Sequence, residues 1–463
     1  MKGIPAGVSA SHPATARAGL QVLRDGGTAG DAAVAAVLAC CVAETIFTGL
    51  GGGGFATYFD AATGEVTCLD FFTAVPGLDD DCRAGPMIAV DVFFGGLPQV
   101  YSIGGASVGV PGVPAGCGEV HRRWGRLPWA EVVSPAISLA KTGVPTPEAH
   151  ARTLDACAPA LAWGEGAAVY TPNGRRLAGG DLLFHPGLAT ALDALALNGP
   201  SIFYTGDFAP IVVDTVRRAG GVLGPRDLAE YRVLETPVDH AELGGYRVRA
   251  RHDLNRTVDT IGGLPADLTR PHRAPGVAAA LRDQGRQRIG DTTNISVVDP
   301  DGNACVITTT LGLGSGVWLP GLGINLNSML GEGELITDDM RPGRRMSSNM
   351  CPLVVIDPDG RLAVAAGSAG ASRIRTALID TLLGVLIDGL DMTEAIARPR
   401  FHVVDDTVHA EFGYPRAELA ALDQAGWRIK QWPDLNHYFG GVTAVGQAGA
   451  AGDPRRAGVG LLL

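Results

Sequence analysis

The segment that most constrains the fold runs from residue 290 to residue 310 and reads G-D-T-T-N-I-S-V-V-D-P-D-G-N-A-C-V-I-T-T-T. Two runs rich in β-branched residues flank Asp301-Gly302, a dipeptide that suits a type I′ hairpin turn because both central positions need φ > 0. A two-residue turn predicts that paired residue numbers sum to about 603. Thr292 should then lie near Leu311, and Thr293 near Thr310. The same pattern is also typical of an ordinary Thr-rich strand pair, since Thr favours strands.

Helical and strand patterns alternate along the rest of the chain, which favours a mixed α and β fold. Helices are predicted at residues 13–25, 31–44, 129–141, 185–197 and 207–219, and strands at 56–59 and 65–70. Four glycines occupy residues 51–54, but no Lys-Ser/Thr pair follows as a phosphate-binding P-loop requires, so close backbone packing is favoured there. Residues 242–290 are Arg-rich and show little periodicity, which could indicate a mobile connector.

Composition excludes several classes of function. The formal net charge of −11 argues against electrostatic binding of nucleic acid. No signal peptide is recognisable at the N-terminus, and the longest uncharged apolar stretch, residues 32–43, is too short to cross a bilayer. The eight cysteines form no C-x-x-C pair and are expected to be reduced, and the apolar settings of Cys40, Cys41 and Cys305 favour buried thiols. Ten histidines without H-x-x-x-H spacing argue against a metal site. We therefore expect a soluble cytoplasmic protein that binds no metal, nucleic acid or membrane.

Several separated blocks match one protein family in the same order. They are the glycine run at 49–55, G-V-P-G-V-P-A-G (109–116), F-Y-T-G (203–206), G-G-V-L-G-P-R-D-L-A-E-Y (220–231), the hairpin with its D-G-N-A, G-S-A-G-A-S-R-I (367–374) and A-R-P-R-F-H (397–402). On these blocks the chain resembles the γ-glutamyltranspeptidases, which are N-terminal-nucleophile hydrolases made as single precursors. The resemblance covers most of the chain except about residues 247–289. It implies an α+β fold, the four-layer αββα sandwich, without a metal or organic cofactor.

The resemblance also implies self-processing at Thr292. In such precursors the hydroxyl of the Thr that heads the T-T motif attacks the preceding carbonyl, and hydrolysis of the resulting ester cuts the chain. Here the cut would fall between Asp291 and Thr292 and give fragments 1–291 and 292–463, which together form one domain. Cutting places nucleophile and base in one residue, because the Thr292 Oγ attacks and its freed α-amine accepts the proton.

Further catalytic residues follow from the same resemblance. The backbone N–H groups of Gly370 and Ala371 would form the oxyanion hole, before an apolar helix predicted at 374–387 whose positive end favours an anion. Thr310 is expected to hydrogen-bond to the Thr292 hydroxyl, which the hairpin register also favours. His12, in S-H-P-A-T, is expected to be structural because the terminal amine already supplies the base.

The parts of the family motif that recognise glutamate are altered. Relatives carry an Arg after D-[FY] that binds the substrate α-carboxylate, and this chain has Phe72 there, which offers no bidentate hydrogen bonds. Asn294 stands where a His is usual, and Glu332 only approximately matches an acidic ligand of the substrate amine. Alignment of the motifs gives the candidate substrate-binding residues as Phe72, Asn294, Gly312, Glu332, Ser348 and Asn349.

Three functions stay open on the sequence. The first is a self-processing Thr hydrolase acting on a carbonyl compound other than a standard γ-glutamyl amide, in a natural-product pathway, by amide or C–C bond hydrolysis. The second is ordinary γ-glutamyl transfer or hydrolysis of glutathione-type substrates, with another cation such as Arg83 replacing the missing Arg. The third is an unprocessed, non-catalytic binding protein. For the enzymes, the expected partners are a small-molecule substrate and the two fragments themselves, and a homodimer of such heterodimers is one open assembly.

Overall fold

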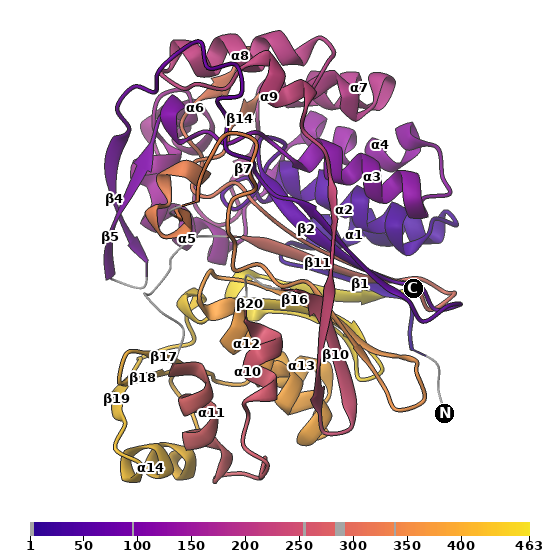
Figure 1. Ribbon diagram of the computed structural model, residues 1–463, viewed down its shortest axis with the longest axis vertical. Helices are drawn as coiled ribbons and strands as arrows, with labels where there is room; N and C mark the ends of the chain where they lie inside the picture. Colours follow the sequence, from indigo (N-terminus) through magenta and orange to yellow (C-terminus); the bar gives the residue numbers. More distant parts are fainter. Residues whose placement is uncertain (1–3, 95–96, 253–255, 283–291, 338) are drawn as a thin grey trace.

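Two antiparallel sheets lie face to face at the centre of the molecule (Figure 1). The computed structural model describes residues 4–94, 97–252, 256–282, 292–337 and 339–463. The seven-stranded sheet has the order β22-β1-β11-β12-β2-β3-β8, and the six-stranded sheet has the order β21-β20-β16-β15-β10-β9. In chain order these strands are β1 (Gly7–Ala10), β2 (Gly53–Phe59), β3 (Val66–Phe71), β8 (Leu234–Thr236), β9 (Val238–Leu243), β10 (Tyr246–Arg251), β11 (Thr293–Val298), β12 (Ala304–Thr310), β15 (Leu353–Ile356), β16 (Leu362–Ala369), β20 (Gly441–Gly446), β21 (Gly449–Gly452) and β22 (Val459–Leu462).

Helices cover the outer face of each sheet, so the four layers αββα that the resemblance implied are confirmed (Figure 1). The helices on the side of the seven-stranded sheet include α1 (Pro13–Arg24), α2 (Ala29–Ala43), α3 (Val113–Trp124), α4 (Trp129–Thr142), α7 (Leu188–Asn198) and α8 (Phe208–Arg218). Those on the side of the six-stranded sheet include α10 (Thr257–Gly262), α11 (Arg273–Arg282), α12 (Arg373–Leu382), α13 (Met392–Ala397) and α14 (Arg416–Gln424). A π-helical turn, Leu383–Ile387, extends α12.

Smaller elements surround the sandwich. They are the hairpin β4 (Ile88–Phe94) and β5 (Leu97–Ile103), the pairs β6 (Val144–Pro145) with β7 (Leu182–Leu183) and β13 (Trp318–Leu319) with β14 (Ile324–Asn325), the strands β17 (Phe401–Val404), β18 (Thr407–Ala410) and β19 (Arg428–Gln431), and the helices α5 (Glu148–Leu161), α6 (Gly166–Tyr170) and α9 (Pro225–Ala229).

The core of the sandwich is mainly apolar, both between the sheets and beneath the helices. Val298 and Val306 of the first sheet meet Val354, Ala365 and Val445 of the second. Every residue of α2 is buried, because this helix lies between the first sheet and α4. The helix predicted at residues 31–44 is therefore confirmed as α2. The thiols of Cys40, Cys41 and Cys305 are free and buried as predicted, whereas Cys82 is exposed.

The predicted connector at residues 242–290 was wrong for the part of it that the structure describes. That part contains the end of β9, β10, α10 and α11, so it joins the six-stranded sheet to its helical cover. Residues 253–255 and 283–291 lie outside the described residues. Most other predicted elements are present with ends shifted by a few residues; the helix predicted from His185, for example, begins at Leu188.

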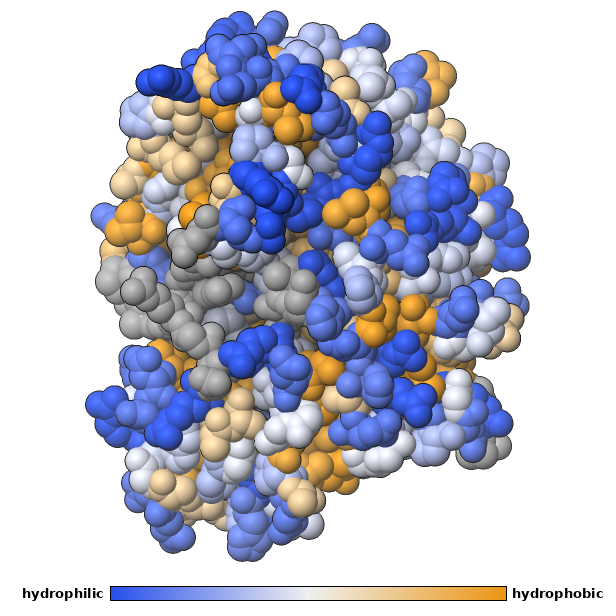
Figure 2. All heavy atoms as spheres, in the orientation of Figure 1, coloured by the Kyte–Doolittle hydropathy of each residue, from blue (hydrophilic) through white to orange (hydrophobic). Residues whose placement is uncertain are grey.

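Residues before and after position 291 contribute strands to both sheets. In the first sheet β11 and β12 lie between β1 and β2, and in the second β15 pairs with β10. Figure 2 shows hydrophilic side chains over most of one face, with hydrophobic ones in small separate groups. Among the described residues, no helix has the length and apolar character needed to cross a membrane.

Candidate active site

Thr292 and Thr310 face each other at the open end of the central hairpin. β11 pairs with β12 in a register that puts Thr293 opposite Thr309, so continuing it by one residue puts Thr292 opposite Thr310. The predicted pairing of Thr292 with Leu311 was therefore wrong by one residue. Both hydroxyl-bearing residues are almost completely buried, with 4% and 5% exposure, and the Thr310 Oγ1 accepts a hydrogen bond of 3.0 Å from the Gly312 N–H.

The error in register comes from the turn. The Asp299 N–H donates to the Asn303 carbonyl at 3.0 Å, which leaves a three-residue loop in place of the predicted two-residue turn. Gly302 has φ +86° while Asp301 is not in the left-handed region, as in a type I turn followed by a left-handed glycine. The extra loop residue moves the pairing by one and brings Thr310 to Thr292.

A small pocket lies beside these threonines. It collects seven of the residues predicted from the sequence, which come from separate parts of the chain. The full lining consists of Phe72, Thr292, Thr310, Met329, Glu332, Leu335, Ser348, Asn349, Met350, Ala371 and Ile374. The apolar members Met329, Leu335, Met350 and Ile374 were not singled out from the sequence, where Met and aliphatic residues usually indicate core.

Two predicted substrate-binding residues do not line this pocket. The Asn294 side chain is fully buried between the sheets, where its amide hydrogen-bonds with the hydroxyls of Thr308 at 2.6 Å and Thr443 at 2.7 Å. A substrate contact by Asn294 is therefore not supported. Gly312 lies behind the lining, with φ +67°, and a Cβ there would come within 2.7 Å of the Glu332 Oε1. Gly312 thus leaves room for the Glu332 carboxylate.

The loop before α12 has an unusual backbone. Gly370 has φ +116°, and a Cβ there would lie 2.8 Å from the Gly440 Cα. Ala371 also adopts a positive φ, +50°, which costs a non-glycine residue about 1 kcal/mol. Among the described residues, no acceptor takes a hydrogen bond from either N–H. Ala371 lies on the pocket wall, so its N–H and that of Gly370 remain the candidates for an oxyanion hole.

The glycine run at residues 51–54 packs directly against the strand of Thr310. A Cβ on Gly52 would lie 2.2 Å from the Thr310 carbonyl oxygen, and one on Gly54 would lie 2.4 Å from that of Thr308. A Cβ on Gly53 would come within 3.0 Å of the Phe72 Cα. The predicted close backbone packing thus explains why these four positions are glycines. Through Gly52 and Gly53 this packing brings the backbones of Thr310 and Phe72 close together.

Comparison with known proteins decides the family. The family model described as gamma-glutamyltranspeptidase matches residues 15–252 and 266–463. The chain belongs to the γ-glutamyltranspeptidase family. It is 28% identical to a glutathione hydrolase proenzyme of Pseudomonas aeruginosa over 98% of this chain and 94% of that protein, and 25% identical to one of Bacillus subtilis over 92% and 85%. A cephalosporin acylase from Bacillus halodurans has the same fold, with a TM-score of 0.82, 21% identity, and coverage of 100% of this chain and 96% of the other.

The pocket of this family member contains no cation among the lining residues that the structure describes, and its one ionisable group is Glu332. Phe72, which the sequence motifs align with the family's Arg, is 1% exposed, with its ring 5.4 Å from that of Phe55. The exposed Arg83 does not line the pocket.

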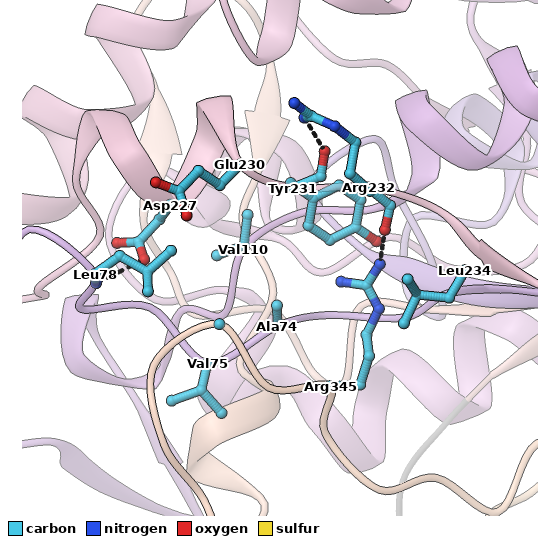
Figure 3. Close-up of a pocket in the computed structure, with 11 residues that line it drawn as sticks. Ala74, Val75, Leu78, Val110, Asp227, Glu230, Tyr231, Arg232, Leu234 and Arg345 are labelled. Carbon is cyan, nitrogen blue, oxygen red and sulfur yellow. Dashed lines mark hydrogen bonds between the residues drawn. The ribbon is translucent and has the colours of Figure 1, made fainter.

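Two arginines lie near Phe72 but are held by other groups. The Asp70 carboxylate lies 3.6 Å from the Arg251 guanidinium and 3.4 Å from that of Arg345. The Arg251 guanidinium also stacks on the Phe55 ring, 4.2 Å from its centre. Figure 3 shows Arg345 beside Tyr231 and hydrogen-bonded to the Arg232 carbonyl, in a second pocket that shares no lining residue with the first. Neither guanidinium therefore reaches the pocket of Thr292.

His12 has the structural role that was expected. Its Nδ1 accepts a hydrogen bond of 2.9 Å from the Ala14 N–H and so caps the start of α1. Burial lowers its pKa to about 4, which keeps the ring neutral.

One buried carboxylate near the site was missed. Glu44, at the end of α2, is 0% exposed and accepts a hydrogen bond of 2.5 Å from the Thr293 Oγ1. The sequence carried a signal for it, since a single acid ends an otherwise apolar helix.

Proposed function

We propose that this protein is a self-processing hydrolase in which Thr292, freed as an N-terminus, attacks a carbonyl substrate other than a standard γ-glutamyl amide. The observation that carries the proposal is the pocket itself, which joins Thr292, Thr310 and Ala371 to apolar walls and one carboxylate. The Thr292 Oγ attacks the carbonyl, its α-amine takes the proton, and the N–H groups of Gly370 and Ala371 stabilise the oxyanion.

Processing would cut the peptide bond between Asp291 and Thr292, leaving 291 residues and 463 − 291 = 172 residues. Asp291 lies outside the described residues. Since each fragment contributes strands to both sheets, we expect the fragments to stay together as one domain.

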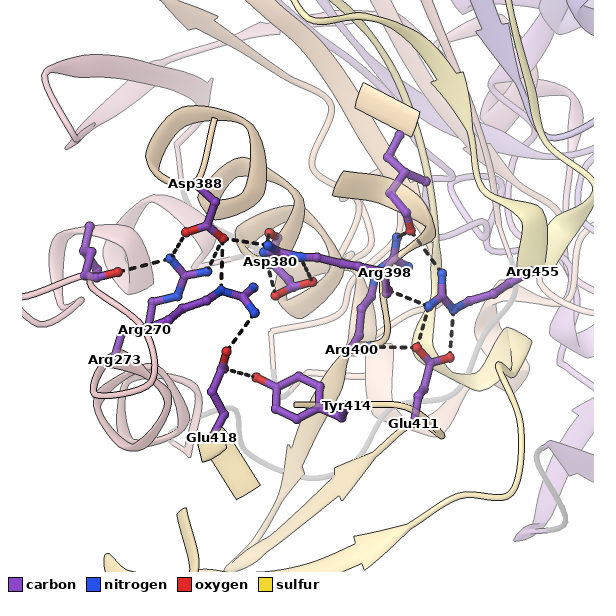
Figure 4. Close-up of polar contacts among 12 residues, drawn as sticks. Arg270, Arg273, Asp380, Asp388, Arg398, Arg400, Glu411, Tyr414, Glu418 and Arg455 are labelled. Atoms are coloured by element: carbon purple, nitrogen blue, oxygen red, sulfur yellow. Dashed lines mark hydrogen bonds and ion pairs between the residues drawn. The ribbon is translucent and has the colours of Figure 1, made fainter. Parts of the chain in front are cut away.

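Ion pairs between the two fragments would further stabilise their association. Arg273 forms a bidentate pair with Asp388 at 2.7 and 2.6 Å, and Arg270 contacts both Asp388 at 3.1 Å and Glu418 at 2.7 Å (Figure 4). These arginines precede the proposed cut, and the acids follow it. Because Arg273 is 3% exposed and Asp388 18%, these contacts are partly shielded from solvent.

The substrate follows from what the pocket lacks. A buried glutamyl α-carboxylate needs a cation, and neither Phe72 nor the held arginines supply one. Apolar groups beside the scissile bond would instead pack against Met329, Leu335 and Ile374. We therefore favour a natural-product amide, or a ketone cleaved at its C–C bond, since both reactions begin with attack on a carbonyl.

Ordinary γ-glutamyl hydrolysis or transfer is the second candidate. It is favoured by Glu332, Ser348 and Asn349, which still line the pocket at positions aligned with substrate-contacting residues of relatives. Under this alternative the carboxylate would be bound by hydrogen bonds from Ser348 and Asn349 alone.

Intact mass spectrometry tests the processing. The wild type should give two fragments, the smaller starting at Thr292, whereas Thr292→Ala should give one chain of 47.7 kDa. A wild type that stays a single chain would overturn the enzyme proposal and leave the non-catalytic binding protein.

Release of p-nitroaniline tests the substrate. γ-Glutamyl-p-nitroanilide and 4-aminobutanoyl-p-nitroanilide differ only in the α-carboxylate, so their kcat/KM ratio isolates its recognition. We expect no preference for the γ-glutamyl compound. A preference of about tenfold or more, worth about 1.4 kcal/mol, would support the ordinary γ-glutamyl enzyme.

A further inference from the structure

Glu44 lies on the side of the first sheet opposite to the pocket. Side chains alternate along β11 and β12, so Thr292 and Thr310 point to one face while the pair Thr293 and Thr309 points to the other, toward α1 and α2. There Glu44 receives two hydroxyl donors, the Thr293 Oγ1 at 2.5 Å and the Thr15 Oγ1 of α1 at 2.6 Å. Both are the short contacts typical of an ionised acceptor.

Arg456 reaches the residue before Thr293. This side chain, from the 3-10 turn Pro454–Arg456, is 3% exposed, and its Nη1 lies 3.5 Å from the Thr292 carbonyl oxygen. Two buried groups of opposite charge thus contact successive residues of the T-T motif. Thr293 is β-branched and has few rotamers, so holding its hydroxyl also restrains its backbone.

Resting on the proposed function, we propose that Glu44 is a positioning residue for the nucleophile: ionised Glu44, through the Thr293 hydroxyl, and Arg456, through the Thr292 carbonyl, fix the peptide that joins Thr292 to Thr293. Glu44 does not touch the reacting atoms. It acts through Thr293 on the direction in which the Thr292 side chain enters the pocket.

The protonation of Glu44 then governs this restraint. An ionised carboxylate accepts from both threonines, whereas a protonated one carries its own O–H donor, so one of the two contacts must rearrange. Burial raises the pKa of Glu44 to about 7, against the lowering effects of Thr15, Thr293 and Arg456. Cys40, one helical turn earlier, is a further titratable group close to it, and burial raises the pKa of this thiol so that it stays neutral.

Stability and processing should therefore respond in opposite directions. The folded-state pKa of Glu44 lies above its ordinary value of 4.5, so its ionisation destabilises the fold as pH rises from 4.5 to about 7. Glu44→Gln removes that charge. It should melt at a higher temperature than the wild type at pH 8 and yet process more slowly, a combination that a purely structural carboxylate would not give.

Self-processing is the readout, because it needs no known substrate. Precursors made by cell-free synthesis are chased at pH 5.5–8.5, and conversion is followed on denaturing gels. The wild-type rate should rise with a midpoint near pH 7, and Glu44→Gln should stay about tenfold slower at pH 8 without that step. Thr293→Val should behave similarly, whereas Thr293→Ser, which keeps the hydroxyl, should process within about threefold of the wild type.

Thr15→Val is the matched control, since it removes the other donor to the same carboxylate without altering the strand of Thr292. Loss of that donor should move the midpoint to higher pH and leave the high-pH rate unchanged. If Glu44→Gln fails to fold, the pH midpoint of processing in Thr15→Val still tests whether Glu44 positions Thr292. An unshifted midpoint in Thr15→Val, or a Glu44→Gln profile that matches the wild type, would overturn the inference while leaving Thr292 processing intact. A wild type that never processes would overturn the proposed function itself.

Discussion

Replacing Phe72 by Arg is expected to create recognition of γ-glutamyl compounds. Phe72 follows β3, is 1% exposed, and lines the pocket together with Thr292. An Arg at this position would bring into the pocket the cation that its described lining lacks. A guanidinium there can form two parallel hydrogen bonds with a substrate α-carboxylate, which a phenyl ring cannot.

The expected gain in kcat/KM of Phe72→Arg follows from the new hydrogen bonds to the substrate carboxylate. The expected loss of stability follows from burying a cation in place of the Phe72 ring. A hydrogen bond to a charged group contributes about 1.5–3 kcal/mol, which corresponds to about 10- to 150-fold in kcat/KM at 1.36 kcal/mol per tenfold. In the free enzyme the variant loses about 2–3 kcal/mol of ring burial and gains a buried cation whose partner arrives only with substrate. Stacking of the new guanidinium on Phe55 would contribute little, because Arg251 already stacks on that ring at 4.2 Å. The variant should therefore melt earlier and hydrolyse γ-glutamyl-p-nitroanilide faster.

Two matched variants separate charge from shape. Phe72→Met keeps a neutral side chain of similar volume and should give no gain, while Phe72→Lys adds charge without the planar fork and should give a smaller one. Gels and melting curves identify the variants that are folded and processed, and only these are compared. The reasoning is refuted if such a Phe72→Arg enzyme gains no more than Phe72→Met on the γ-glutamyl anilide.

Three further predictions test the supports of the site. Gly52→Ala, whose Cβ would lie 2.2 Å from the Thr310 carbonyl, should lose about 3 kcal/mol of unfolding free energy and process poorly, whereas Gly49→Ala, 3.6 Å from its nearest neighbour, should match the wild type in both melting and processing. Gly370→Ala, at φ +116°, should displace an N–H of the proposed oxyanion hole and slow hydrolysis of 4-aminobutanoyl-p-nitroanilide by the processed enzyme about 100-fold, and an unchanged rate would exclude that role. Burial opposes ionisation of Asp388, but hydrogen bonds from Arg273 and Arg398 outweigh it and lower its pKa from 3.8 to about 2. Because solvent partly screens this carboxylate, Asp388→Asn should lose about 1 kcal/mol of unfolding free energy at pH 6 in denaturant titrations. That loss should fade as pH falls from about 4 toward 2, because the wild type then also loses the charge; a loss independent of pH would contradict the ion-pair role.

The sequence predicted the layers of the fold and the position of the hairpin, because period, turn residues and ordered family blocks carry that information. The register was wrong by one residue, since Asp301-Gly302 fits two turn types and only the backbone of the folded loop distinguishes them. The error mattered at Thr292, which it paired with Leu311 in place of Thr310. A single residue of turn length thus decides which side chain faces Thr292, the proposed nucleophile.

Burial could not be predicted where chain segments meet only in three dimensions. Asn294 directly follows the T-T motif and aligned with a substrate contact. Its side chain lies on the same face of β11 as Thr292 but two residues further along the strand, between the sheets, where it hydrogen-bonds with Thr308 and Thr443. Glu44 is separated by 249 residues from its partner Thr293. No local pattern reports such a pair; only the packing of α2 against the first sheet does.

The pocket is built from two kinds of segment, which differ in whether a substitution there would move the Thr292 hydroxyl. Thr292 and Thr310 extend central strands of a seven-stranded sheet, where the glycine run leaves no room for movement of the Thr310 backbone. Phe72 and Glu332 lie outside regular strands, in segments whose backbone does not carry the nucleophile. Substitutions there alter what the pocket binds without moving the reacting hydroxyl, so a change of substrate is expected to begin at such positions. The Phe72→Arg enzyme should accordingly keep the processing rate of the wild type while its choice of anilide changes; slower processing in a folded variant would show that the two supports are not independent.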